Sequence, residues 1–387
     1  MRRNLLRSLL AFALIAVLSP AWAAATTGGK FRARDSHGRP LAHISAYSPN
    51  DDGNGKGWAK VQWNFTGPFG VGAYGAWNNL ISAGHPGGSG TTVAVLDTGV
   101  AYQTIGRYKR SPDLLPNQFV RGYDFVDQDS QPLDEHGHGT HVASTIAERT
   151  NNRIGLTGLA YGAKIMSVRV LDSIGEGDAV TIARGVRYAT DRGVDVINLS
   201  LEFDSSVRAR ELRPLLSAIA YANRKGIVVV GASGNEGDDL VSYPARDPTV
   251  IAVGATTEHG CLSAFSNQGP NLDLVAPGGG PDADLAEPNC RPDGRKGRNI
   301  SQVTFKGSKL RGFGIPRDYA GTSMAVPHVS ATAAMVIASG VIGPHPTPQA
   351  VEARLTRTAR DLGPPGPDVL YGAGLLDAAA ATSRFIP

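Results

Sequence analysis

The sequence has no long hydrophobic run and little excess charge. Its longest apolar stretch near the amino terminus, SLLAFALIAVL, is shorter than the roughly 18 apolar residues that a bilayer-spanning helix needs, and no later stretch reaches that length. We therefore expect no membrane anchor. The formal net charge is only +4 over 387 residues. This charge leaves the chain without the electrostatic signature of nucleic-acid-binding proteins, so we expect no nucleic-acid partner.

Cysteine is also scarce, and the two cysteines, Cys261 and Cys290, leave two possibilities open. They could form one disulfide if the protein reaches an oxidising compartment, or they could remain two separate thiols.

The first 25 residues are typical of a secretory signal peptide. MRRNLLR is a basic start, an apolar core follows, and SPAWAAA supplies small residues for cleavage near residues 23–25. Loss of the three arginines in this segment would lower the net charge to +1. We expect a secreted or periplasmic protein, in which the polar, glycine-rich residues 26–60 form an irregular N-terminal arm.

The rest of the chain alternates between strand-like and helix-like segments, which predicts one α/β domain over residues 61–387. Short apolar runs predict strands at 91–97, 163–171, 194–201, 226–234 and 249–256. Amphipathic or apolar segments predict helices at 140–149, 178–193, 207–225, 324–339, 348–361 and 375–382. This order favours an open, mostly parallel twisted sheet with helices on both faces. Residues 278–318 are polar and rich in glycine and proline, and we interpret them as a long surface insertion.

Three residues that could catalyse acyl transfer stand at the ends of these elements. Asp97 closes the strand in VAVLDTGV, His138 precedes a helix in HGHGTHVA, and Ser323 begins a helix in GTSMA. A serine hydroxyl is a weak nucleophile until an imidazole takes its proton, and a buried carboxylate fixes the tautomer of that imidazole. Carboxyl ends of parallel strands meet at one edge of a sheet, so these residues could share a site. Taken alone, Ser323 could equally be a helix cap.

An oxyanion site is needed as well. The amino terminus of the helix after Ser323 would supply a backbone N–H and the positive end of a helix dipole. Asn235, in the turn of VVGASGNEG, could supply a side-chain amide, although asparagine is also common in ordinary turns.

Four segments carry a resemblance to a known family. VAVLDTGV, HGTHVA, VVVGASGNEG and GTSMAVPHV resemble the signature blocks of the subtilisin-like (S8) serine endopeptidases, in the same order and over about residues 60–382. The resemblance implies an Asp97–His138–Ser323 triad, an oxyanion role for Asn235 and hydrolysis of protein or peptide substrates through an acyl-enzyme. We expect a monomer.

Four further segments, DFVDQDS, TNNRIG, SVRVLD and NLSL, resemble the calcium-binding, thermitase-like branch. This resemblance implies structural Ca²⁺ and no catalytic cofactor. The first implied site uses the side chains of Asp113, Asn152 and Gln62 and the carbonyls of Ile154 and Leu156. The second uses Asp124, Asp127 and Asp129, with Leu133 where the branch often has an oxygen ligand.

By the same resemblance, substrate lies as an extended strand between two segments. Ser200, Leu201 and Glu202 form one side, and Ala232, Ser233 and Gly234 line the first pocket. Glu202 and Phe203 replace glycines of the family. Our hypothesis is that Glu202, together with Glu236, favours basic side chains in the substrate.

Three alternative functions compete with this interpretation. The spacing of His136, His138 and His141 is also found in zinc hydrolases, but Thr140 stands where that motif has aspartate. A lipase-type hydrolase would need G-x-S-x-G around Ser323, which is absent. A secreted binding protein that had lost its chemistry would not need all four catalytic residue types. We expect His141 and His328 to be structural.

Overall fold

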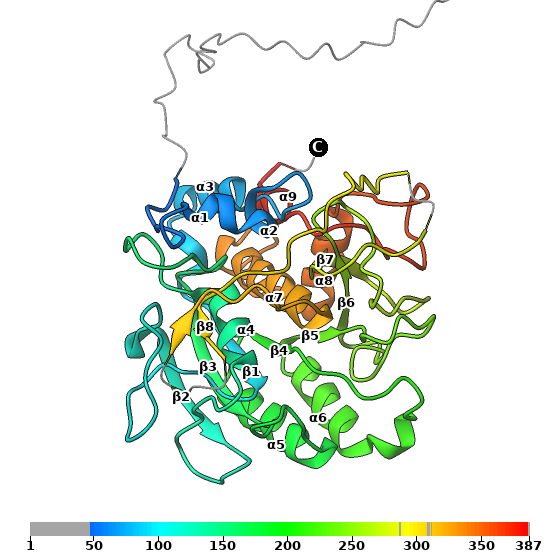
Figure 1. The fold of residues 1–387 in the computed structure, drawn as a ribbon. Coiled ribbons are helices and arrows are strands. Elements are labelled where there is room, and N and C mark those ends of the chain that lie inside the picture. Colours follow the sequence, from blue (N-terminus) through cyan, green and yellow to red (C-terminus); the bar gives the residue numbers. More distant parts are fainter. Residues whose placement is uncertain (1–46, 286–287, 308–309, 311, 386–387) are drawn as a thin grey trace, which may run out of the picture. The chain divides into compact units, whose positions relative to one another are not determined.

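A seven-stranded sheet forms the centre of the fold (Figure 1). The computed structural model describes residues 47–285, 288–307, 310 and 312–385. In spatial order the strands are β2 (Phe119–Asp124), β3 (Lys164–Arg169), β1 (Thr92–Asp97), β4 (Val196–Leu199), β5 (Val228–Ala232), β6 (Ile251–Thr256) and β7 (Leu274–Pro277). Each neighbouring pair runs parallel. The predicted open parallel sheet is therefore confirmed.

Helices cover both faces of this sheet because its strands are apolar on both sides. Val93 and Val95 of β1 pack in a cluster with α3 (Ala73–Ser82), α4 (His138–Ala147) and α7 (Thr322–Ser339). The alternate residues Ala94 and Leu96 pack in a second cluster with α5 (Ala179–Asp191) and α6 (Arg213–Arg224). Alternation of side chains along a strand is the cause of this division. Helix α7 lies in the middle of its layer (Figure 1).

Shorter elements complete the fold. They are α1 (Trp58–Val61), α2 (Trp63–Thr66), α8 (Pro348–Arg357), α9 (Ala378–Thr382) and the 3₁₀ helices η1 (Pro86–Gly88), η2 (Pro116–Gln118) and η3 (Ala209–Glu211). Within the described residues, none of the helices is both long and apolar enough to cross a bilayer.

The segment before residue 61 is more ordered than the predicted irregular arm. Residues 47–60 belong to the same compact unit as the sheet, and this part of the arm holds the start of α1. Asp51 and Trp58 are both only 3% exposed. Trp58 packs in the core, and its indole N–H donates to the carbonyl of Pro49 at 2.8 Å. The predicted signal peptide and residues 26–46 of the arm lie outside the described residues.

Residues 278–318, predicted as a surface insertion, also contribute to the interior. They contain the two-stranded antiparallel sheet of β8 (Thr304–Phe305) and β9 (Phe313–Gly314). Ile300 and Phe305 are buried, and the backbone carbonyl of Ile300 lies 3.2 Å from Nε2 of His141 in α4. Cys261 and Cys290 form a disulfide in this structure, which links the loop after β6 to the segment.

Candidate active site

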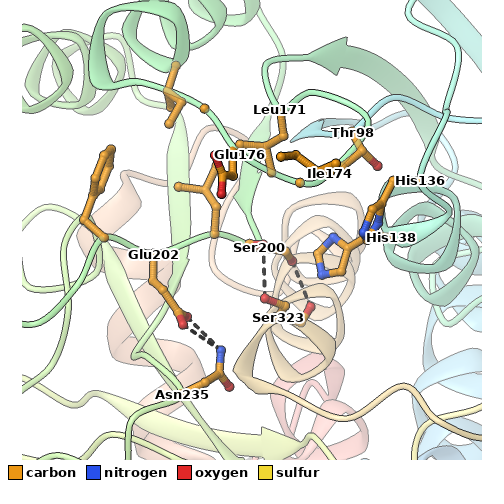
Figure 2. Close-up of a pocket in the computed structure, with 15 residues that line it drawn as sticks. Thr98, His136, His138, Leu171, Ile174, Glu176, Ser200, Glu202, Asn235 and Ser323 are labelled. Atoms are coloured by element: carbon orange, nitrogen blue, oxygen red, sulfur yellow. Dashed lines mark hydrogen bonds between the residues drawn. The ribbon is translucent and has the colours of Figure 1, made fainter.

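The carboxyl ends of the central strands and the amino termini of two helices meet at one cavity of about 510 Å³. Asp97 ends β1, Ser200 follows β4, and Asn235 follows β5. His138 begins α4 and Ser323 lies in the first turn of α7. Figure 2 shows these side chains, apart from Asp97, around the cavity. The candidate catalytic residues, which are far apart in the sequence, are thus brought together.

Asp97 and His138 form a close pair. Nδ1 of His138 lies 2.8 Å from Oδ1 and 3.0 Å from Oδ2 of Asp97. The Asp97 side chain is fully buried, whereas that of His138 is 20% exposed. Burial acts to lower the pKa of His138, but the carboxylates around it, Asp97 first and then Asp134 and Glu202, outweigh burial and raise the pKa above its usual value. A carboxylate in this position fixes the tautomer with its proton on Nδ1 and leaves Nε2 as the base.

Asp134, which the sequence analysis did not single out, holds the loop before His138. Its buried carboxylate accepts hydrogen bonds from the hydroxyls of Thr98 at 2.9 Å and Thr140 at 2.6 Å. It also accepts from the backbone N–H groups of His136, Gly137 and Thr140. This network connects the end of β1 to the start of α4, and so it fixes the position from which the imidazole projects.

Ser323 is not hydrogen-bonded to His138 in this structure. Its hydroxyl donates to the backbone carbonyl of Ser200 at 3.1 Å, and the Ser200 hydroxyl donates to the Ser323 carbonyl at 2.9 Å. Both His138 and Ser323 line the cavity. Rotation about the Cα–Cβ bond of Ser323, between staggered rotamers, would redirect its hydroxyl, and such contacts often tighten only when substrate is bound.

The amide of Asn235 has a fixed orientation. Its oxygen accepts from the backbone N–H of Thr322 at 2.8 Å and from the Thr322 hydroxyl at 3.2 Å. Its nitrogen therefore points the other way, where it donates to both carboxylate oxygens of Glu202 at 2.9 and 2.8 Å (Figure 2). Burial raises the pKa of Glu202 above its usual value, although the hydrogen bonds from Asn235 act in the opposite direction.

The predicted substrate-binding residues divide into two groups. Ser200, Leu201 and Glu202 line the cavity. Ala232 and Ser233 are fully buried, and the Ser233 hydroxyl donates to the carbonyl of Asn267 at 2.9 Å, away from the cavity. Gly234 is buried too, and residues 232–234 are not among the described residues that line the cavity. The cavity is also lined by residues that sequence reasoning missed, among them Thr98, Leu171, Ile174 and Glu176.

The first predicted calcium site collects oxygen atoms from three distant segments. The carboxylate of Asp113 is fully buried, and it accepts from the Asn152 amide at 2.6 Å and from the Leu156 N–H at 3.2 Å. Burial raises the pKa of Asp113 to about 7. Asp51, a residue missed by the sequence analysis, accepts from the N–H groups of Asn151 and Asn152 at 2.8 and 2.9 Å.

Calcium fits this donor set only in part. In the described ranges, no group of three or more His, Cys, Asp or Glu side chains is arranged so that it could hold a metal ion, so a cation would depend on amide and carbonyl oxygens as well. The amide of Gln62 is used by Thr157, whose carbonyl and N–H it contacts at 2.8 and 3.1 Å. Asn152 now presents nitrogen to Asp113, and a half-turn of its amide would present oxygen instead.

The second predicted calcium site does not fit. The guanidinium of Arg169 lies between two of its carboxylates, 2.9 Å from Asp124 and 2.7 Å from Asp127. The carboxylate of Asp129 accepts from the N–H of Gln131 at 2.7 Å. A buried arginine supplies the positive charge that these carboxylates require, so we do not propose calcium there.

The zinc alternative is also not supported by the geometry. Nδ1 of His138 is used by Asp97, whereas the ring of His141 is buried and stacked on Tyr319 with centroids 4.2 Å apart. Burial lowers the pKa of His141 to about 3. His328 is buried as well, with its Nδ1 2.9 Å from the Met324 carbonyl and its Nε2 2.8 Å from the Asn64 amide. Both residues have the structural roles that were expected.

Comparisons with known proteins agree with this geometry. Residues 88–374 match the subtilase family. The chain is 40% identical to a thermophilic serine proteinase of Bacillus sp. (strain AK1) over 66% of this chain and 54% of that protein. It is 37% identical to thermitase of Thermoactinomyces vulgaris over 65% of this chain and 77% of thermitase.

A solved structure of proteases from Pseudoalteromonas arctica superposes with a TM-score of 0.68 at 30% identity, over 87% of this chain and 99% of that one. The aligned region thus spans about half of the AK1 proteinase but nearly all of the solved structure. The chain belongs to the subtilase family of serine-type endopeptidases.

Proposed function

We propose that the protein is an exported serine endopeptidase that hydrolyses peptide bonds through an acyl-enzyme on Ser323. The observation that carries the proposal is the Asp97–His138 pair, at 2.8 Å, on the same cavity as Ser323. Export is supported by the leader-like sequence of residues 1–25.

In the proposed first step, Nε2 of His138 takes the proton of the Ser323 hydroxyl as its oxygen attacks the substrate carbonyl. Asp97 holds the imidazole and stabilises the cation that forms. The backbone N–H of Ser323, at the start of α7, and the amide of Asn235 donate to the oxyanion. His138 then protonates the leaving amine, and water completes the reaction by the reverse sequence of proton transfers.

The proposed substrate is a protein or peptide segment that lies extended along Ser200–Glu202. Pairing of backbones would supply affinity, and the cavity beside them would supply selectivity. We propose one structural calcium ion, held by Asp113, Asp51, Asn152 and the carbonyls of Ile154 and Leu156, in a monomeric enzyme. Calcium would neutralise buried carboxylates there and takes no part in catalysis.

The test is to measure peptide hydrolysis and labelling by a fluorophosphonate in the wild type and in Ser323→Ala. We expect one label per wild-type molecule, located on Ser323, with loss of activity in step with labelling. The alanine variant should have the wild-type melting temperature, no label and near-background hydrolysis. A zinc-selective chelator should leave wild-type activity intact. Hydrolysis that persists in Ser323→Ala would refute the proposal.

A further inference from the structure

The amide assigned to the oxyanion is already engaged in this structure, and its partner is a carboxylate. We propose that Glu202 closes the oxyanion site of the free enzyme and that a lysine or arginine in the substrate opens it by drawing the Glu202 carboxylate away. The inference rests on the proposed function. It adds a substrate class, peptides with a basic residue on the amino side of the cleaved bond, and it makes Glu202 the residue that determines specificity.

The contact between Glu202 and Asn235 blocks the donor in two ways. The Asn235 amide cannot turn to another acceptor, because its oxygen is held by the N–H and hydroxyl of Thr322. Both Glu202 oxygens lie within 2.9 Å of the amide nitrogen. A tetrahedral intermediate would have to compete for the amide with this carboxylate, whose negative charge would also repel the oxyanion. Glu202 must move before Asn235 can assist the reaction.

The charges around the cavity favour a cation as the group that moves it. Glu176 and Glu202 both line the cavity, and the lining contains neither lysine nor arginine in the part of the chain that the structure describes. Glu236 follows Asn235 in the same turn and acts on Glu202 as a like charge. Glu236 acts to raise the pKa of Glu202, whereas the imidazole of His138 acts to lower it. Besides Glu176, Glu202 and His138, the described lining contains one more titratable residue, His136. An ammonium or guanidinium would find carboxylate acceptors here, and no lysine or arginine of the described lining would compete for them.

The side chain of the substrate residue before the cleaved bond would lie within reach of Glu202. An oxyanion donor lies about 3 Å from the carbonyl oxygen under attack. The Glu202 carboxylate is hydrogen-bonded to that donor, the Asn235 amide. It would therefore lie within one side-chain length of the substrate residue whose carbonyl is attacked. A charged donor from that residue would form a stronger hydrogen bond with Glu202 than the neutral Asn235 amide does. A neutral side chain offers no such replacement, and the amide would stay occupied.

The experiment compares two peptides that differ only in the residue before the cleaved bond, lysine in one and leucine in the other. Both are assayed with the wild type, Glu202→Ala and Glu202→Gln. Glu211→Gln serves as the matched control, because Glu211 is exposed in η3 and lies outside the lining of the cavity. Circular dichroism melting curves establish that every variant is folded.

We expect the wild type to have at least a tenfold higher kcat for the lysine peptide. In Glu202→Ala, kcat for the leucine peptide should rise tenfold or more, toward the 10²–10³ that an oxyanion donor typically supplies, with little change in KM. Glu202→Gln removes the charge but keeps an acceptor for Asn235, so it should lose the lysine preference with a smaller rise in kcat. Glu211→Gln should resemble the wild type.

Two results would overturn the inference. One is an unchanged lysine-to-leucine ratio in both Glu202 variants, and the other is an equal fall in kcat for the two peptides. Failure of the proposed function is distinguishable from both, because in that case Ser323 would not react with the fluorophosphonate and no variant would hydrolyse either peptide. Ser323-dependent hydrolysis without an effect at Glu202 refutes only the gating role.

Discussion

The position of one proton decides what His138 can do. Asp97 contacts Nδ1, so the neutral imidazole carries its proton there and Nε2 is free to accept one from Ser323. The residue types at the ends of the predicted elements made these residues candidates, and the family resemblance implied the pairing of Asp97 with His138 and the donor role of Asn235. They were not sufficient to predict that Glu202 bonds to Asn235, because that contact depends on the path of two loops after separate strands.

The pH dependence of the reaction tests the pair. His138 acts as a base only when it is neutral, and Asp97 raises the pKa of His138. We therefore expect kcat/KM to fall on the acid side with a midpoint above the usual 6.5 or so of histidine. Asp97→Asn should lower that midpoint and reduce kcat by about 10⁴. A midpoint that does not move between the two proteins, measured from pH 5 to 9, would argue against the pairing.

Two helices bring the reacting groups to the ends of the strands, and their starting points matter. Segments 140–149 and 324–339 were predicted as helices, but α4 and α7 begin earlier, at His138 and Thr322, and so include the catalytic residues. Strand β2, an edge strand with a bulge beside β3, and the four-residue β7 were missed. The sequence of β2, FVRGYD, mixes polar residues and glycine with its apolar residues, and β7, LVAP, is apolar but short and ends in proline, so the local pattern of neither was distinctive.

The start of α4 is packed too closely for a side chain at residue 139. A Cβ added to Gly139 would lie 2.2 Å from the backbone oxygen of Gly99 and 3.0 Å from Oδ1 of Asp97. Gly139→Ala should therefore push the helix start away from β1 and separate His138 from Asp97. We expect kcat to fall by about 10² or more.

The matched control for this change is Gly297→Ala, whose added methyl group would have its nearest contact at 3.5 Å. This variant should retain wild-type kinetics and melting temperature. Wild-type kcat in Gly139→Ala would mean that the helix start tolerates displacement and does not position His138.

On the scale of the whole molecule, the segment that contacts Asp113, residues 152–156, is also joined to residues 51–53, which are distant in the sequence. The N–H of Gly53 donates to the carbonyl of Gly155 at 2.8 Å, and Asp51 holds the backbone of Asn152. The family resemblance led to Asp113, Asn152 and Gln62, but it did not single out Asp51. The polar sequence around Asp51 predicted an irregular arm. The residues that donate hydrogen bonds to Asp51 are about a hundred positions later in the sequence, so local pattern could not reveal this contact.

Removal of the proposed calcium ion should therefore lower the stability of the whole domain. A ligand at a hundredfold excess over its Kd stabilises the folded state by about 2.7 kcal/mol. We expect a chelator to lower the melting temperature of the wild type by several degrees, and to have a much smaller effect on Asp113→Asn and Asp51→Asn.

Asp129→Asn is the control for calcium removal, because Asp129 belongs to the site that we reject. It should respond to the chelator as the wild type does. A wild-type melting curve that is the same with and without the chelator would contradict the proposed calcium site.

The proposed catalysis requires Ser323 and His138 to act as one unit, and a double-mutant comparison of kcat measures this most directly. Ser323→Ala, His138→Ala and the double variant are assayed on one peptide, each with its melting curve. If the two side chains share one proton transfer, all three variants should have the same residual kcat within a few-fold. If the losses of the single variants multiply in the double variant, the residues act independently and the proposed triad is wrong.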